Sequence, residues 1–390
     1  MDKIADAFSL IRNGANIKQG LDDSGYPITR IETISNRTVD RDKMGYAGIT
    51  DITKYSDYVL QDGDILMSHI NSETHLGKVA RYEKYEGETI IHGMNLLCLR
   101  PNKNLVDSRY AFYYLSSEAF LHQIPRITKK SVNQASFNVA ALKELTFPIS
   151  SMEVQQPVAD ILDKANELIA LRKEQLAKLD ELVKARFVEM FGIYPANPKG
   201  WETGTIRDVV SDVRYGSSRP AVDGGKYPYL RMNNITYGGE LDLSDTKRID
   251  IPDNELDKCT VRRGDVLFNR TNSKELVGKT CVYNRDDMMV LAGFVIRVRV
   301  SERILPEFLS EFLNTEFSKQ MLLAMCKTAI GQANINAQEM QNIGLYLPPI
   351  ELQRKFVQFK EQTDKSKVAV QKALDETQLL FDSLMQKYFR

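Results

Sequence analysis

The sequence has little of what marks several common classes of protein. Among its 390 residues there are four cysteines, and no apolar run approaches the roughly 18 residues that a membrane-spanning helix needs. The cysteines form no CxxC pair and stand far from the four histidines, which argues against zinc sites and disulfides. The N-terminal stretch lacks the basic and then apolar layout of a signal peptide. We therefore expect a soluble, cytoplasmic protein with four reduced thiols, no bound metal and no membrane association.

The chain also lacks an excess of charge of either sign. Lysine and arginine together number 52, as do aspartate and glutamate, so the formal net charge is zero. Overall charge thus gives no indication of a nucleic-acid partner, and any DNA-binding surface must be a local patch.

Motifs for DNA-modifying chemistry are missing as well. An adenine methyltransferase needs an Asp/Asn-Pro-Pro-aromatic loop and a glycine-rich cofactor loop, and neither is present. Pro252-Asp253 has no acidic-x-Lys triplet after it, as a metal-dependent nuclease would require, and there is no phosphate-binding GxxxxGK[ST]. All histidines lie in the first half of the chain, and we expect most of them to be ordinary surface or turn residues: His69, His75, His92 and His122. We expect no catalytic centre and no cofactor.

What the sequence does contain is a long internal repeat. The stretch 61–66 recurs as 262–267, an offset of 201 positions, and 134–138 recurs as 332–336, an offset of 198 positions. Small insertions and deletions in loops explain why the offset changes along the chain. Because a period near 200 residues is far longer than that of a solenoid, the repeat indicates a domain duplication with pseudo-twofold symmetry.

Each repeat begins with a globular part of mixed α and β structure. Short apolar runs bounded by Gly or Pro turns predict strands, among them 64–67, 95–99 and 294–298. Helical spacing of aromatic and aliphatic residues predicts core-packed helices at 109–124 and 306–325. A Gly-Asp pair opens one strand in each repeat, and we interpret it as a turn with glycine at positive φ.

Each repeat ends in a long helix with a coiled-coil pattern. Apolar residues recur at seven-residue intervals from 152 to 190, and at roughly 1.5 Å per residue such a helix is about 58 Å long. The second helix has the same pattern, but Lys360, Thr363 and Lys367 dilute its first half, so we expect its best packing towards the C-terminus. The alternative is two separate surface helices, each covering its own domain. The predicted seam comprises Leu162, Ile169, Leu176, Leu179, Val183, Val370, Leu374, Phe381 and Leu384.

A linker with two prolines and a glycine separates the repeats, and Trp201, the only tryptophan, opens the second globular part. We expect Trp201 to anchor that start by burial. The predicted organisation is a first domain at 1–148, a first spacer helix at 149–192, the linker at 193–200, a second domain at 201–346 and a second spacer helix at 347–390.

This organisation resembles the specificity subunit of type I restriction-modification systems over the whole chain. The local resemblance lies in Leu-Pro-Pro-Ile-Glu-Leu-Gln at 347–353, its weaker copy at 149–155, the Gly-x-Gln-x-Asn-Ile-Asn-like stretches and the opening Gly200-Trp201-Glu202. The first repeat lacks an opening Gly-Trp, and Ser150-Ser151 stands where the second repeat has Pro348-Pro349. These departures affect only the domain boundaries.

The resemblance implies a fold and a set of partners. The fold is α+β, with two pseudo-twofold related α/β target recognition domains joined by two long helices that form an antiparallel coiled coil and act as a ruler. Each domain reads one half of a split sequence in double-stranded DNA. Two adenine methyltransferase subunits dock on this scaffold, and two motor-nuclease subunits join for restriction. Three alternative functions stay open. The nearest is the same recognition module in another methyltransferase or nuclease system, the next is a coiled-coil scaffold for proteins alone, and the third is an enzyme.

DNA reading requires guanidinium, amide and hydroxyl groups on segments that can enter a groove, backed by cations for the phosphates. Each such residue alone can equally be solvated surface, but polar, cationic segments recur in both repeats. The candidates of the first repeat are Arg12, Lys18, Arg37, Arg41, Lys43, Arg126, Lys129, Lys130, Asn133 and Gln134. Those of the second repeat are Arg214, Ser217, Ser218, Arg219, Arg270, Asn272, Lys274, Lys327, Gln332 and Asn334.

Overall fold

The computed structural model describes residues 2–20, 24–35, 37–132, 134–329 and 332–390. The chain divides into two compact units. Unit 1 comprises Met1–Lys173 with Lys372–Arg390, and unit 2 comprises Glu174–Gln371. Each unit therefore contains one globular α/β part and half of each long helix.

The globular part of unit 1 is built on a four-stranded antiparallel sheet in the order β1-β7-β4-β6. A three-stranded sheet, β5-β9-β8, and a two-stranded sheet, β2-β3, accompany it. The strands are β1 (Phe8–Asn13), β2 (Pro27–Ile28), β3 (Gly45–Tyr46), β4 (Ile65–Ser68), β5 (Ile70–Asn71), β6 (Val79–Arg81), β7 (Leu96–Pro101), β8 (Lys129–Lys130) and β9 (Ala135–Ser136). The helices are α1 (Ile4–Ala7), α2 (Ser108–Ser116), α3 (Glu118–Leu121), α4 (Ile124–Ile127) and α5 (Val139–Lys143).

Unit 2 repeats this plan with an additional sheet. The order β11-β19-β15-β17 matches the four-stranded sheet of unit 1, and β16-β21-β20 matches its three-stranded sheet. The strands are β10 (Glu202–Thr205), β11 (Val210–Tyr215), β12 (Tyr227–Leu230), β13 (Lys247–Ile249), β14 (Thr260–Val261), β15 (Val266–Asn269), β16 (Thr271–Asn272), β17 (Thr280–Val282), β18 (Met289–Leu291), β19 (Val295–Val300), β20 (Lys327–Ala329), β21 (Gln332–Asn334) and β22 (Gly344–Leu347). The helices are α7 (Asp253–Cys259), α8 (Pro306–Asn314), α9 (Glu316–Met325) and α10 (Ala337–Gln341). The sheet β13-β12-β18-β14 stands where unit 1 has β2-β3 and contains a parallel pair, β12 with β18, and the additional sheet is the two-stranded β10-β22.

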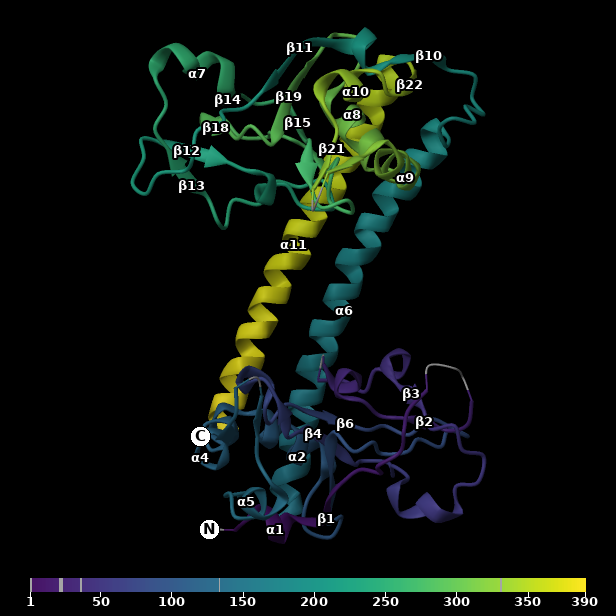
Figure 1. The fold of residues 1–390 in the computed structure, drawn as a ribbon, viewed down its shortest axis with the longest axis vertical. Helices are drawn as coiled ribbons and strands as arrows, with labels where there is room; N and C mark the ends of the chain where they lie inside the picture. The colour runs from purple at the N-terminus through teal and green to yellow at the C-terminus, as the bar shows by residue number, and fades with distance from the viewer. Residues whose placement is uncertain (1, 21–23, 36, 133, 330–331) are drawn as a thin grey trace. The chain divides into compact units, whose positions relative to one another are not determined.

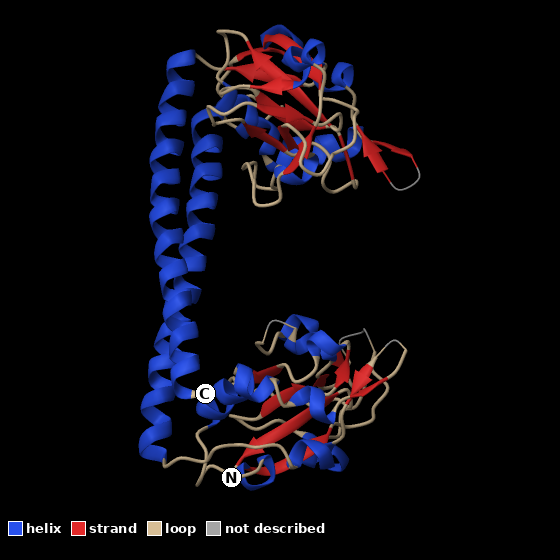
Figure 2. Cartoon of the chain, turned by 90° about the vertical axis from the view of Figure 1, so that its left-hand side faces the viewer, coloured by secondary structure: helices blue, strands red, loops and turns tan. Residues whose placement is uncertain are grey.

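The two long helices, α6 (Met152–Phe191) and α11 (Ile350–Tyr388), pair antiparallel within each unit (Figures 1 and 2). In unit 2, Asp180 of α6 forms an ion pair with Lys367, and Phe187 contacts Phe356 at 5.2 Å between ring centroids. In unit 1, Arg172 donates a hydrogen bond to the carbonyl of Ala373. The helices therefore form the predicted antiparallel coiled coil and are not separate surface helices.

Burial along the helices differs from the predicted pattern. Leu162, Ile169 and Val183 are buried, whereas the other six predicted seam residues are half-buried: Leu176, Leu179, Val370, Leu374, Phe381 and Leu384. The expectation that the second helix packs best at its C-terminal end is wrong. Phe356, in its first half, is fully buried in the core of unit 2, while Leu379 and Leu380 are 69% and 54% exposed.

Each unit has its own main core, and the long helices contribute to both. In unit 1, Val158, Ala159 and Leu162 of α6 pack with Phe389 against the sheet and α2. In unit 2, Phe187 and Phe191 of α6 pack with Phe356 of α11 and with Phe308 of α8. The helices are therefore integral to both domains.

Three further expectations can be compared with the structure. Trp201 is half-buried and donates a hydrogen bond from Nε1 to the carbonyl of Phe191 at 3.0 Å, which ties the start of the second domain to α6. The four cysteines are unpaired. His75 and His122 are exposed as expected, but His69 and His92 are buried, so a surface position is wrong for these two. No helix in the described part of the chain is long and apolar enough to cross a membrane.

Candidate nucleic-acid interface

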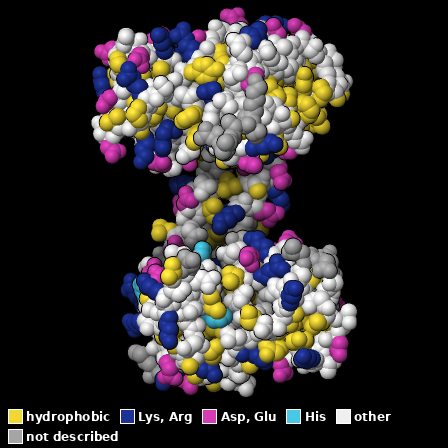
Figure 3. Space-filling model, viewed as in Figure 1, with side chains coloured by type: hydrophobic (Ala, Val, Ile, Leu, Met, Phe, Trp, Pro, Cys, Tyr) yellow, Lys and Arg dark blue, Asp and Glu magenta, His cyan; other side chains and the backbone are white. Residues whose placement is uncertain are grey.

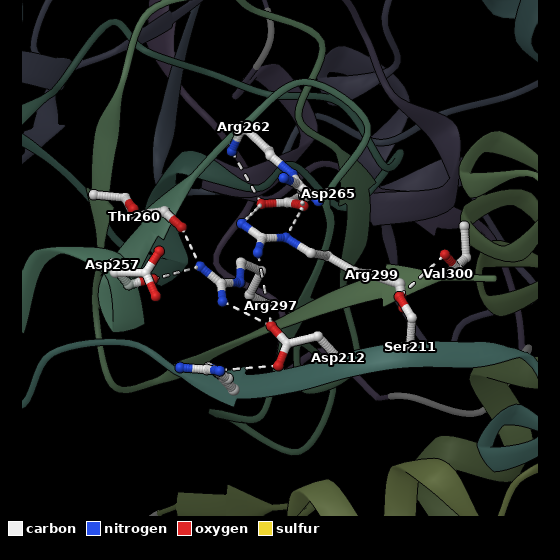
Figure 4. Close-up of polar contacts among 10 residues, drawn as sticks. Ser211, Asp212, Asp257, Thr260, Arg262, Asp265, Arg297, Arg299 and Val300 are labelled. Carbon is white, nitrogen blue, oxygen red and sulfur yellow. Dashed lines mark hydrogen bonds and ion pairs between the residues drawn. The ribbon is translucent and has the colours of Figure 1, made fainter.

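The repeated Gly-Asp pairs are structural turns, as interpreted from the sequence. Gly63 and Gly264 have φ of 86° and 88°, in the region that favours glycine. The Asp265 side chain accepts hydrogen bonds from the Arg262 backbone N–H at 3.0 Å and from Arg299 Nε at 2.9 Å (Figure 4). Asp64 forms the equivalent contacts in unit 1, with Arg100 as its partner. These buried charges close turns and are not available to a ligand.

A buried arginine distinguishes unit 2 from unit 1. Arg297 of β19 is 1% exposed, and its Nη2 donates to Asp212 at 2.8 Å while Nη1 donates to the carbonyls of Asp257 and Thr260 (Figure 4). Burial disfavours the charged carboxylate, but hydrogen bonds from Arg214 and Arg297 nevertheless lower the pKa of Asp212. The equivalent residue in unit 1 is the buried Cys98, which pairs with Leu66 of β4 as Arg297 pairs with Leu267 of β15. Unit 2 thus holds an internal ion network at a position where unit 1 has an uncharged cysteine.

In unit 2 the small sheet β16-β21-β20 brings together candidates that are distant in sequence. Asn272 lies on β16, Lys327 on β20, and Gln332 and Asn334 on β21. The side chains of Lys327 and Gln332 lie outside what the structure describes. Candidates from two stretches that are distant in sequence, 270–274 and 327–334, therefore meet on one sheet.

Arg270, just before β16, links this sheet to the end of β11, where the candidate Arg214 lies. Its Nη2 donates to Asn334 Oδ1 at 3.2 Å, and its guanidinium lies over the ring of Tyr215 at 4.8 Å from the centroid. Tyr215 ends β11 and follows Arg214 directly. The backbone N–H of Arg270 donates a hydrogen bond to the carbonyl of Phe294. We call Tyr215, Arg270, Phe294 and Asn334 the Arg270 patch.

Two of the other candidates of unit 2 are paired with acids. Arg214 pairs with Asp212 at 2.9 Å and Arg219 with Glu255 at 2.6 Å. Ser217 is buried, whereas Ser218 and Lys274 are exposed.

In unit 1 the small sheet β5-β9-β8 carries the cations of the equivalent hairpin. Lys129 and Lys130 lie exposed on β8, and Lys130 pairs with Glu73 at 2.6 Å. Arg126 and Lys129 are exposed and, among the residues that the structure describes, have no carboxylate within ion-pair distance. Val132, between the two strands, is 99% exposed, and Gln134 is exposed as well. Asn133 lies outside the described residues.

The remaining candidates of unit 1 lie elsewhere on its surface. Arg41 and Lys43 line a cleft of about 680 Å³ together with Arg30. Arg41 pairs with Glu88 at 2.7 Å, and the hydrogen bonds from Arg41 are the main cause that lowers the pKa of Glu88 to about 2. Arg37 shares a smaller cavity of about 280 Å³ with Lys130.

Two other candidates of unit 1 are not gathered with these. Arg12 lies over the Tyr58 ring at 3.8 Å from the centroid, and Lys18 is exposed in a loop. On the face of each unit seen in Figure 3, Lys and Arg are interspersed with Asp and Glu, so cationic surface is indeed local.

Sequence reasoning missed several residues at these sites. Asn71 on β5 is the counterpart of Asn272, and the 201-residue offset alone could have found it. Tyr215 and Phe294 were missed because their exposure, 44% and 49%, is not visible in the sequence. Arg30 was missed because only the fold brings it beside Arg41.

Comparison with known proteins gives the family. The model of the type I restriction modification DNA specificity domain matches twice, at residues 2–181 and 198–377. The putative MjaX specificity subunit of Methanocaldococcus jannaschii is 40% identical over 210 residues, 54% of this chain and 49% of that relative. The EcoKI specificity subunit of Escherichia coli K12 is 22% identical over 391 residues, 95% of this chain and 83% of that relative. The aligned part of the chain thus spans about half of the first relative and most of the second.

Two solved structures share the fold. A chain from a study of assembly and conformational transition in a type I system has a TM-score of 0.59 at 17% identity, covering 100% of this chain and 96% of that chain. The type I S subunit from M. genitalium has a TM-score of 0.57 at 15% identity, covering 100% and 95%. The chain belongs to the family of type I restriction-modification DNA specificity domains, of which it carries two. This confirms the resemblance to the specificity subunit of type I restriction-modification systems.

Proposed function

We propose that the chain selects the DNA target of a cytoplasmic type I restriction-modification complex, with one half-site read by each unit. The observation that carries this proposal is the duplicated plan: the same order of strands recurs in the four-stranded and three-stranded sheets of both units. Two similar readers suit a target with two halves.

The proposed reading surface of each unit centres on its small three-stranded sheet. In unit 1 the exposed Arg126 and Lys129 have no described carboxylate partner, so their charges are available to DNA phosphates. In unit 2 the Arg270 patch adds a guanidinium and an amide, which can hydrogen-bond base edges. Arg214 and Arg219 already pair with Asp212 and Glu255, so we assign them a smaller share of binding.

We further propose that two adenine methyltransferase subunits and two motor-nuclease subunits assemble on this chain. The duplicated domains offer each kind of partner two similar positions. The paired helices then set the distance between half-sites, because both contribute to the cores of both units. The domain and helix boundaries given in the sequence analysis remain predictions.

The test is to co-express the chain with its adenine methyltransferase and to map methylated adenines across the genome. We expect one motif with two half-sites and a fixed gap. Replacing residues 201–346 with another recognition domain should change one half-site only. A change in both half-sites would contradict the assignment of one half-site per unit.

A binding assay checks the proposed surface of unit 1. Lys129→Ala should weaken binding of the assembled complex to all sequences alike and reduce the salt dependence by about one phosphate contact. Lys103→Ala, an exposed lysine in the loop before α2, serves as the matched control. If both variants bind like the wild type, Lys129 is ordinary solvated surface.

A further inference from the structure

The Arg270 patch has the features of a base-reading site and not only of a cationic surface. Arg270 is half-buried, and its Nε is buried with no hydrogen-bond partner among the described residues. Because this atom is closed to solvent, the donors that remain for a ligand are those of Nη1 and Nη2, and Nη1 has no hydrogen-bond partner among the described residues. The Tyr215 ring lies under the guanidinium and is 44% exposed, and Phe294, whose carbonyl accepts the Arg270 N–H, is 49% exposed. The patch therefore combines a guanidinium that has hydrogen-bonding capacity to spare with apolar surface open to solvent.

The guanidinium is held in place from several sides. The Arg270 backbone donates to the Phe294 carbonyl at 3.0 Å, and its own carbonyl accepts the Ile335 N–H at 2.9 Å. The Tyr215 ring lies under the guanidinium, and Asn334 accepts from Nη2. Arginine loses little side-chain freedom on binding when its planar fork is already oriented in this way. An oriented fork suits a bidentate contact better than a contact with a mobile phosphate.

Unit 1 offers a comparison at the same position. There, His69 takes the place of Arg270: its carbonyl accepts the N–H of Phe137, as that of Arg270 accepts the N–H of Ile335. His69 is 6% exposed and its ring lies against Phe137 at 6.3 Å. The position therefore holds a half-buried cation in unit 2 and a buried ring in unit 1.

We propose that Arg270 reads a guanine in the half-site of unit 2, and that unit 1 reads no guanine through the equivalent position. In the major groove, guanine presents O6 and N7, two acceptors that match the donors of one guanidinium. The inference rests on the proposed function and adds to it which base is read and which residue reads it. A good bidentate contact of this kind discriminates against other bases by about ten- to a hundredfold.

The experiment compares variants in the complex assembled with its adenine methyltransferase. Methylated motifs are mapped for the wild type, Arg270→Lys, Arg270→Gln and a control, Arg285→Ala, in which an exposed arginine paired with Asp287 is removed. Lysine keeps the charge but loses the fork. We expect both Arg270 variants to lose the preference for guanine at one position of one half-site, by about ten- to a hundredfold. All other positions, and the control, should be unchanged.

Several results would overturn the inference. If Arg270→Lys methylates the wild-type motif unaltered while Arg270→Gln weakens binding to all sequences, Arg270 contacts a phosphate. If both variants fail to assemble, or if Trp201 fluorescence shows that they are unfolded, Arg270 is a structural residue. A wild-type motif with no guanine in the half-site of unit 2, identified by replacing residues 201–346, would refute the inference alone. Absence of any two-part motif from the wild type would refute the proposed function.

Discussion

The aromatic cluster of unit 2 allows a quantitative test of how the long helices are held. Phe187 of α6 is fully buried, with ring centroids at 4.9 Å from Phe191, 5.3 Å from Phe308 and 5.2 Å from Phe356. Phe187→Ala removes contacts to α8 and α11 together. Truncation of a buried phenylalanine costs about 3 to 5 kcal/mol, because both transfer energy and packing are lost. For a unit of this size, this corresponds to a fall in Tm of about 6 to 20 °C.

The assay is chemical or thermal unfolding followed by Trp201 fluorescence. Trp201 is the only tryptophan, and its Nε1 donates to the carbonyl of Phe191 at 3.0 Å, so its emission reports on this cluster. Leu182→Ala is the matched control, since Leu182 lies on the same helix but is 48% exposed. We expect that variant to lie within about 1 kcal/mol of the wild type. If Phe187→Ala is as stable as the wild type, the aromatic cluster does not hold α6 to unit 2, and this explanation is refuted.

Three further predictions follow from particular contacts. Asp265→Ala should destabilise unit 2 by about 3 to 5 kcal/mol because the half-buried Arg299 loses its closer ion pair, at 2.9 Å, and keeps only the 3.9 Å pair with Asp212. Asp286→Ala, which removes an exposed pair, should cost less than about 1 kcal/mol in the same denaturation assay, and equal losses would contradict this. Burial lowers the pKa of His92 to about 4. The neutral side chain therefore makes its full contribution to the free energy of unfolding above about pH 6.5, and this contribution is lost as the pH falls towards 4. His92→Gln should remove a pH dependence of about 3 kcal/mol from the unfolding of unit 1 over this range, and an unchanged pH profile would refute it. Inserting one heptad into each of α6 and α11 lengthens each helix by about 10 Å. Methylation mapping should then show a gap longer by about three base pairs with unchanged half-sites, and an active complex with the original gap would exclude the helices as the ruler.

Features encoded in short sequence patterns could be predicted. The duplication, the two long helices and the Gly-Asp turns follow from repeated residues, seven-residue spacing and the need for glycine at positive φ. The structure has these features: Gly63 and Gly264 have positive φ, and α6 and α11 pair.

Features that depend on contacts between distant segments could not be predicted. The seven-residue pattern selects positions that face another helix, but it does not show that Phe187 and Phe356 meet an aromatic ring from α8. Lys367 interrupts the apolar pattern of the second helix, yet Asp180 and Glu240 form ion pairs with it. Likewise, no local pattern distinguishes Arg297, which is buried, from Arg270, which is partly exposed beside Tyr215.

The most direct test of the central claim is the methylation map of the chain co-expressed with its adenine methyltransferase, read beside a map of the methyltransferase expressed alone. The account predicts that methylated adenines occur in one two-part motif with a fixed gap, and only when this chain is present. The same pattern of methylation with and without the chain, or a motif with one continuous part, would contradict it.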